Sequence, residues 1–230
     1  MRILVLGHKG LLGSSLISLL GADFTDLRFP SPEFINFITR SNYDVIVNCA
    51  VNKINDKVVN VDLPTFLSAS CNYLVQFSSD AVFSGLKPHN LKYDKTDLVD
   101  PDTIYGQQKV MMEQSLIGIS NSLIIRTSFI DQKSPFVQNI LSQPKFLAFT
   151  NYLWSGLTAK QVSLLTLSCI KNNKTGLCHM FSNRTQSKYQ LAKKVACCYN
   201  TQTEIIPVDY PSLNRQITSD FNINFNITDL

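Results

Sequence analysis

The stretch RILVLGHKGLLG, residues 2–13, decides the fold of this chain. Its first five residues form a short, branched, apolar run, which is typical of a strand buried on both faces of a parallel sheet. Gly7, Gly10 and Gly13 follow at spacings of three, and leucines then recur at helical spacing over residues 11–20. A strand, a glycine loop and a helix in this order predict a dinucleotide-binding turn. The glycines permit a tight turn, a close approach of the backbone to a pyrophosphate and close packing of the helix.

The alternation of strands and helices continues beyond this turn. Further apolar strands are expected at residues 44–50, 73–78 and 122–126, and further helices at 31–40, 57–71 and 105–116. This order predicts an α/β fold, a Rossmann-type doubly wound parallel sheet.

After about residue 130 the pattern breaks into shorter units, with helices expected at residues 135–141, 158–169 and 187–199. We therefore expect a dinucleotide-binding domain over residues 1–130 and a small C-terminal substrate-binding lobe over residues 131–230, packed as one compact unit. The Asn-rich tail over residues 220–230 has no helical period and is expected to be poorly ordered.

Composition limits the classes of function. A chain of 230 residues with 44% apolar and 17% charged residues can bury one full core. Its net charge of +4 is scattered, so no nucleic-acid partner is expected, and no run is long enough to span a bilayer, so we expect a cytoplasmic protein. The six cysteines lack paired C-x-x-C spacing, which argues against a metal site and for buried thiols.

Charges near the glycine loop bear on which dinucleotide binds. NAD-selective sites place an acid about twenty residues after the loop to accept hydrogen bonds from the ribose, and Asp23 and Asp26 are the candidates here. Arg28 ends the presumed second strand and Lys9 lies within the loop, where cations would attract a 2′-phosphate. The alternative for both cations is plain solvated surface charge. The sequence favours NADPH, with NADH as the alternative.

A phenol and an ammonium lie four residues apart, at Tyr105 and Lys109, and hence on one face of the expected helix. The same spacing recurs at Tyr189 and Lys193, which we interpret as a surface pair. The first pair differs in context, because Ser79 follows a sheet strand at its carboxyl end, where ligands of parallel sheets gather. The pattern predicts that Tyr105 donates a proton to a substrate carbonyl and that Ser79 hydrogen-bonds the same oxygen. Lys109 is expected to lower the pKa of Tyr105 and to hold the nicotinamide ribose.

Taken in this order, the segments resemble the extended short-chain dehydrogenases, most closely the dTDP-4-dehydrorhamnose reductases. The resemblance covers most of the chain. The segments that carry it are the glycine loop, VIVNCA (45–50), FSSDAVFSG (77–85), YGQQK (105–109) and IRTSF (125–129). It implies NAD(P)H-dependent reduction of the 4-keto group of a nucleotide-linked 6-deoxy sugar, with dTDP-4-dehydrorhamnose as the leading substrate and a UDP-linked relative next.

The resemblance also assigns roles to residues. It implies that Ser79, Tyr105 and Lys109 are catalytic. The expected cofactor contacts are Gly7, Lys9, Gly10, Leu11, Leu12, Gly13, Arg28, Cys49, Ala50, Val51, Tyr105 and Lys109. The expected substrate contacts are Ser79, Ala81, Val82, Phe83, Tyr105 and Phe129.

The chain departs from the family pattern in several places. Arg28 stands where an aspartate near the adenine is usual, Ala81 where a tyrosine is usual and Phe129 where a tryptophan is usual. The second βα unit and the C-terminal lobe are also shortened. Two other functions therefore stay open: an epimerase that keeps NAD(P) bound, and a non-catalytic NADP-binding regulatory subunit. The expected partner is the nucleotide-sugar substrate, and a homodimer stays open. His8 and His179 are interpreted as structural residues.

Overall fold

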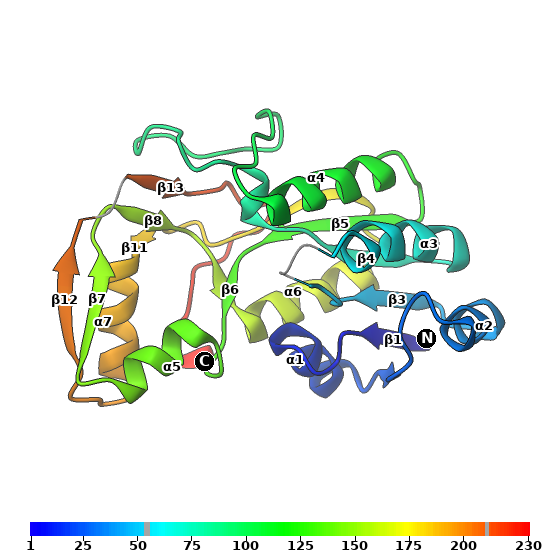
Figure 1. Ribbon diagram of the computed structural model, residues 1–230, viewed down its shortest axis with the longest axis horizontal. Coiled ribbons are helices and arrows are strands. Elements are labelled where there is room, and N and C mark those ends of the chain that lie inside the picture. Colours follow the sequence, from blue (N-terminus) through cyan, green and yellow to red (C-terminus); the bar gives the residue numbers. More distant parts are fainter. Residues whose placement is uncertain (53–55, 210–211) are drawn as a thin grey trace.

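Six parallel strands form the main sheet of the molecule, and a smaller group of strands and helices lies to one side of it (Figure 1). The computed structural model describes residues 1–52, 56–209 and 212–230. The strands of the sheet are β1 (Ile3–Leu6), β2 (Asp23–Phe24), β3 (Val45–Asn48), β4 (Leu74–Phe77), β5 (Ser122–Thr127) and β10 (Gly176–Met180). Their spatial order is β10-β5-β4-β3-β1-β2. Strands β1, β3, β4 and β5 are buried at every position, which explains why they are apolar runs and not alternating ones.

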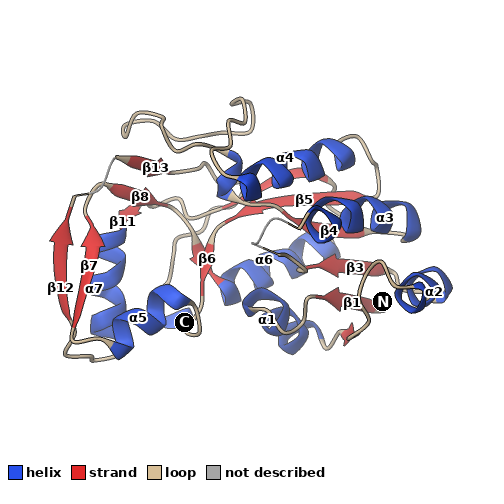
Figure 2. Ribbon diagram, in the orientation of Figure 1, coloured by secondary structure: helices blue, strands red, loops and turns tan. Residues whose placement is uncertain are grey.

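Helices cover both faces of this sheet (Figure 2). Helices α1 (Leu11–Leu20) and α6 (Ala159–Lys171) pack on one face through a core that includes Leu16 and Val162. Helices α2 (Pro32–Arg40), α3 (Leu63–Ser70) and α4 (Ile104–Leu116) contribute to the core on the other face, and a π-helical turn, Val58–Asp62, precedes α3. The predicted Rossmann-type doubly wound sheet is confirmed.

The chain reverses direction across the sheet between β1 and β3. From β1 it moves outward to β2, and it then crosses back to β3 on the other side of β1. In open parallel sheets, such a switch point leaves a crevice beyond the carboxyl ends of the strands, where ligands bind.

A smaller lobe lies beside the sheet. Its elements are α5 (Pro135–Ser142), β7 (Lys145–Phe149), β8 (Tyr152–Trp154), β11 (Gln186–Ser187), α7 (Lys188–Cys198), β12 (Glu204–Val208) and β13 (Leu213–Arg215). Their core includes Val137, Trp154 and Leu191. Two short paired strands, β6 (Phe129–Ile130) and β9 (Leu157–Thr158), join this lobe to the sheet.

The expected division at residue 130 does not match the structure. After the first part of the lobe the chain returns to the sheet, where α6 packs beside α1 and β10 pairs with β5. The tail is also more ordered than expected. Phe221 packs against the core of the sheet, whereas Phe225 packs against the core of the lobe, so the last residues tie the two units together.

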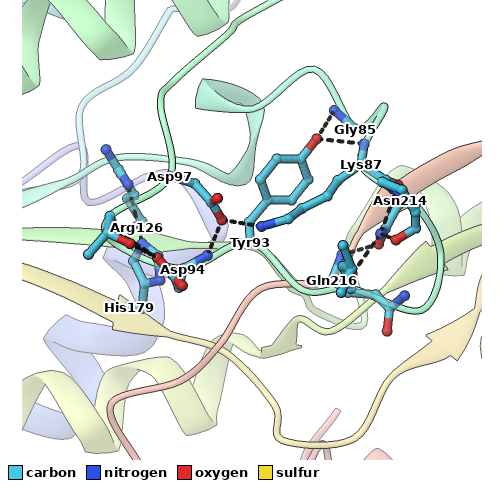
Figure 3. Close-up of polar contacts among 12 residues, drawn as sticks. Gly85, Lys87, Tyr93, Asp94, Asp97, Arg126, His179, Asn214 and Gln216 are labelled. Atoms are coloured by element: carbon cyan, nitrogen blue, oxygen red, sulfur yellow. Dashed lines mark hydrogen bonds and ion pairs between the residues drawn. The ribbon is translucent and has the colours of Figure 1, made fainter.

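Side-chain hydrogen bonds fix the long connection between β4 and α4 (Figure 3). The hydroxyl of Tyr93 accepts hydrogen bonds from the backbone N–H groups of Gly85 and Lys87. The amide of Asn214 donates to the carbonyl oxygens of Lys87, Pro88 and Leu91. Within the residues described, no helix has the length and apolar character needed to cross a membrane.

Candidate active site

The glycine loop forms a close-packed cradle at the end of β1. Gly7 has φ +76°, and a Cβ added there would lie 2.6 Å from the backbone nitrogen of Ala50. A Cβ at Gly13 would lie 2.2 Å from the carbonyl oxygen of Gly7. Gly10 caps α1 without a side-chain hydrogen bond, so the first N–H groups of the helix are left for another acceptor. These features fit the pyrophosphate of a dinucleotide.

A groove of about 450 Å³ extends from this cradle over the end of β2. Its lining includes Lys9, Asp26 and Arg28. Lys9 forms an ion pair with Asp26 (2.6 Å), and this ammonium is the main cause that lowers the pKa of the Asp26 carboxyl. Arg28 lines the same groove. Asp23, the other candidate acid, instead lies 3.7 Å from Arg2. The groove therefore presents both a carboxylate and cations where a ribose would lie.

A second groove, of about 460 Å³, continues from the first across the ends of β3, β4 and β5. Gly10, Cys49, Ala50 and Val51 line both grooves. Of the expected cofactor contacts, Leu11, Leu12 and Gly13 also line the second groove. Ser79, Tyr105 and Lys109 line it together, so the structure brings the three expected catalytic residues into one cleft.

Lys109 is held at the base of this cleft. Its side chain is 3% exposed, and its Nζ donates a hydrogen bond to the carbonyl oxygen of Phe77 (2.9 Å). Burial lowers the pKa of Lys109 to about 8, and Glu113 one turn further along α4 opposes that shift. The Nζ lies 5.7 Å from the centre of the Tyr105 ring.

The pKa of Tyr105 shifts in the direction opposite to the one expected. Burial raises the pKa of Tyr105 to about 12, while a hydrogen bond with Ser79 acts to lower that pKa. Lys109 was expected to lower it, but the ammonium is directed at a backbone carbonyl and burial dominates. The phenol is therefore fully protonated at neutral pH and can act as a proton donor.

Ser79 is oriented by the turn that follows β4. Its hydroxyl donates to Asp80 (3.0 Å) and accepts from the backbone N–H of Ala81 (3.1 Å). This geometry caps a 3-10 turn, Asp80–Val82. Arg215 of β13 donates to the carbonyl oxygen of Asp80 (2.8 Å), which connects the turn to the lobe.

A buried ion pair supports the helix that carries Tyr105 and Lys109. Glu113 of α4 accepts two hydrogen bonds from Arg126 of β5, from Nε (2.9 Å) and from a terminal nitrogen (2.7 Å). Ser78 donates to the same carboxylate. The Nε2 atom of His179 lies 3.3 Å from a terminal nitrogen of Arg126. The histidine is fully buried, which is compatible with its interpretation as a structural residue.

The expected substrate contacts divide into two groups. Phe129 lines the second groove, as Ser79 and Tyr105 do. Val82 and Phe83 are fully buried and pack with Tyr93, because the 3-10 turn directs them into the core. The expectation that their side chains contact substrate is therefore corrected. Ala81 also lies outside the described lining of the groove.

The structure adds residues that the sequence analysis did not single out. Ser134, Phe136 and Lys188 face the second groove from the lobe. The sequence contained the helices that carry them, with Ser187 as a capping residue directly before Lys188. It contained no signal for which helix end would turn toward the sheet. Tyr189 and Lys193, which repeat the Tyr–Lys spacing, lie outside the described lining of the cleft.

Comparisons with known proteins agree with this geometry. The family model described as "RmlD substrate binding domain" matches residues 1–220. A dTDP-4-dehydrorhamnose reductase of Aggregatibacter actinomycetemcomitans is 29% identical over 170 residues, which span 63% of this chain and 57% of that protein.

Solved structures show the same fold. The dTDP-4-dehydrorhamnose reductase of Bacillus anthracis str. Ames in complex with NADP superposes with a TM-score of 0.85 at 18% identity, over 97% of this chain and 94% of that one. The dTDP-4-dehydrorhamnose reductase of Yersinia enterocolitica gives a TM-score of 0.80 at 24% identity, over 100% and 92%. Since the family model matches nearly the whole sequence, the chain belongs to the family of the RmlD substrate binding domain.

Proposed function

We propose that this protein reduces the 4-keto group of a nucleotide-linked 6-deoxy sugar, with NADPH as the favoured reductant and NADH as the alternative. The leading substrate is dTDP-4-dehydrorhamnose, followed by a UDP-linked relative. One observation carries the proposal: Ser79, Tyr105 and Lys109 line a single cleft that is continuous with the glycine-loop groove. The names of the similar proteins and the NADP bound to the Bacillus anthracis structure support it.

The cofactor contacts are assigned from the grooves. The glycine loop and the N-terminus of α1 would hold the pyrophosphate, and Lys9 and Arg28 would lie near the adenosine end. Cys49, Ala50 and Val51 would lie beneath the middle of the dinucleotide, at the join of the two grooves. Lys109 would face the nicotinamide ribose. A reduced dinucleotide bound in this way supplies a hydride to the carbonyl carbon of the substrate.

The residues of the chain then divide the remaining chemistry. Tyr105 donates its phenolic proton to the carbonyl oxygen, so that hydride and proton together convert the ketone to an alcohol. Ser79 turns its hydroxyl hydrogen from Asp80 to the same oxygen and so fixes the position of that oxygen against Tyr105. Lys109, while charged, stabilises the phenolate left on Tyr105 until solvent returns the proton. Phe129 forms part of the wall against the sugar.

The test is a panel of dTDP- and UDP-linked 4-keto-6-deoxy sugars with NADH and NADPH, followed by the loss of reduced-nicotinamide absorbance and the stereochemistry of the product. Reduction of at least one member at the expense of NAD(P)H is expected. Conversion of a sugar without net consumption of NAD(P)H would replace the proposal with an epimerase. Tight NADPH binding without turnover, together with copurification of another protein, would replace it with a regulatory subunit.

A further inference from the structure

Lys188, the first residue of α7, lines the second groove from the lobe. Three aromatic rings surround this ammonium. Its Nζ lies 4.6 Å from the centre of the Trp154 ring, 5.2 Å from that of Phe136 and 5.3 Å from that of Tyr152. The rings exclude water from the ammonium, and the groove that Lys188 lines also contains Tyr105 and Ser79.

Among the residues that the structure describes, none accepts a hydrogen bond or forms an ion pair with this ammonium. Over residues 1–52, 56–209 and 212–230, Lys188 has no ion pair and its side chain donates no hydrogen bond. Asp80 is the carboxylate that influences it, and burial nevertheless lowers the pKa of Lys188 to about 8. The three cation–π contacts offset part of the lost hydration, but no anion among the described residues compensates the charge. Such a group is expected where a ligand supplies the anion.

A second unpartnered group lines the same groove. Ser134 is 6% exposed, and its hydroxyl oxygen is buried without a hydrogen-bond partner. Ser134 caps α5, yet its side chain accepts no hydrogen bond from the helix. The first N–H groups of a helix lack acceptors within the helix and attract anions. Phe136, in the first turn of α5, touches Lys188, which brings this helix end close to the ammonium.

The other charges of the second groove are already engaged. Lys109 donates to the carbonyl oxygen of Phe77, and Asp80 accepts from Ser79. Two lysines line this groove among the residues that the structure describes, and Lys109 is assigned above to the nicotinamide ribose and to Tyr105, so Lys188 is the one left for the substrate. It lies on the lobe side of the cleft, opposite the sheet that carries the glycine loop.

We propose that Lys188, together with the hydroxyl of Ser134, binds the diphosphate of the nucleotide-linked substrate and thereby positions the sugar against Tyr105. This assignment rests on the proposed function and deepens it. The alternative is that Lys188 only packs against the aromatic rings and does not touch substrate. The two differ in whether the contribution of Lys188 to binding depends on phosphate groups in the ligand.

The experiment measures the affinities of dTDP, UDP and thymidine for the NADPH-loaded protein by calorimetry. In Lys188→Met, we expect dTDP and UDP to bind about ten- to a hundredfold more weakly, which is the size of one lost charge-assisted hydrogen bond. Thymidine, which has no phosphate, should bind as it does to the unsubstituted protein. Lys188→Arg should recover part of the loss. Lys193→Met, on the same helix but exposed, should change none of these affinities.

Unchanged binding of dTDP to Lys188→Met, or an equal loss for dTDP and thymidine, would overturn the assignment. Unaltered NADPH affinity and thermal midpoint show whether the variant is folded, and Lys188→Arg provides a second variant if it is not. The outcome is separable from the proposed function. If the protein reduces a keto sugar while Lys188→Met binds dTDP normally, only this inference fails. If Lys188-dependent diphosphate binding is found without any reduction, only the proposed function fails.

Discussion

Tyr105 and Lys109 share one face of α4, and burial moves both of them toward their neutral forms. The pKa of Tyr105 is raised to about 12, and the pKa of Lys109 is lowered to about 8. At neutral pH the phenol is protonated and the ammonium is still largely charged. This combination suits reduction, because the proton to be donated is present and a positive charge is available to stabilise the phenolate that forms.

The first prediction concerns the phenol alone. Tyr105→Phe should lower kcat by roughly 10²–10⁴, because the proton donor is lost while the ring and its packing remain. The Kd for NADPH, measured by fluorescence titration, should change little. Tyr189→Phe, which removes the phenol from the repeated Tyr–Lys spacing on α7, is the matched control. Turnover by Tyr105→Phe at the unsubstituted rate would remove this residue from the mechanism.

The second prediction concerns the charge on Lys109. Because its pKa in the free protein is about 8, kcat/KM for the keto sugar should fall as pH rises through about 8, by about tenfold per unit if one proton is required. Lys188 has a similar pKa, so the profile is best recorded in Lys188→Met as well, where the fall should persist.

The stability of the protein should change in the opposite direction over the same range. A lysine whose pKa is depressed on folding binds fewer protons in the folded state between pH 8 and 10.5, the ordinary pKa of a lysine. The free energy of unfolding attributable to Lys109 therefore rises with pH, as the cost of burying its charge is relieved. A kcat/KM profile that stayed flat beyond pH 9 while the fold remained intact would contradict the role of Lys109 as a required cation.

At the scale of elements, the glycine loop after β1 can keep its conformation only if α1 packs closely against it. Gly13→Ala would place a methyl group against the Gly7 carbonyl, both being backbone positions that cannot rotate away. We expect NADPH affinity to fall at least tenfold and the free energy of unfolding to fall by about 1–3 kcal/mol. Both are measurable by titration and by chemical denaturation.

Ser14→Ala, on the exposed side of the same helix, is the matched control and should leave both quantities nearly unchanged. If Gly13→Ala bound NADPH normally, the loop would be more adaptable than its packing indicates. The assignment of the pyrophosphate to this cradle would then lose its main support.

For the whole molecule, local sequence signals predicted the sheet unit far better than the lobe. Strands β1, β3, β4 and β5 are buried at every position and mostly apolar, and helices such as α2 begin with recognisable caps, so their existence followed from the sequence. Strand β10 begins with an exposed glycine and contains a histidine, and its burial comes from pairing with β5 across a long sequence separation. No local pattern encodes such a pairing.

The residues of the candidate site were likewise predictable only where local sequence determines their position. The sequence places Ser79, Tyr105 and Lys109 next to predicted elements of the sheet. Ligands of open parallel sheets bind beyond the carboxyl ends of the strands, and this was enough to predict that the three residues share one site. Lys188 reaches the cleft only because the lobe lies beside the sheet, which local sequence cannot show. The burial of Phe83 was missed for a related reason, since its partners Phe181 and Ile217 come from distant parts of the chain.

The tail shows how the two units are joined and leads to the last prediction. Phe221, Ile223, Phe225 and Ile227 alternate with exposed residues, a period of two that fits an extended segment lying on a surface. Phe221 and Ile223 contact the core of the sheet, and Phe225 and Ile227 contact the core of the lobe. The tail therefore couples the stabilities of both units, and the protein should unfold in one transition.

Phe225→Ala should test this coupling. Its ring packs edge-on against Trp154, with the centres 5.6 Å apart, and Trp154 in turn forms part of the aromatic surround of Lys188. Removing a half-buried phenylalanine should cost about 2 kcal/mol in the free energy of unfolding, measured by chemical denaturation, and the transition should stay single. Asn224→Ala, next to it and exposed, should cost less than about 0.5 kcal/mol. A tail that bridges two cores makes the unfolding of one core destabilise the other. Two resolved transitions in the unsubstituted protein would therefore show that the sheet and the lobe unfold independently, against this prediction.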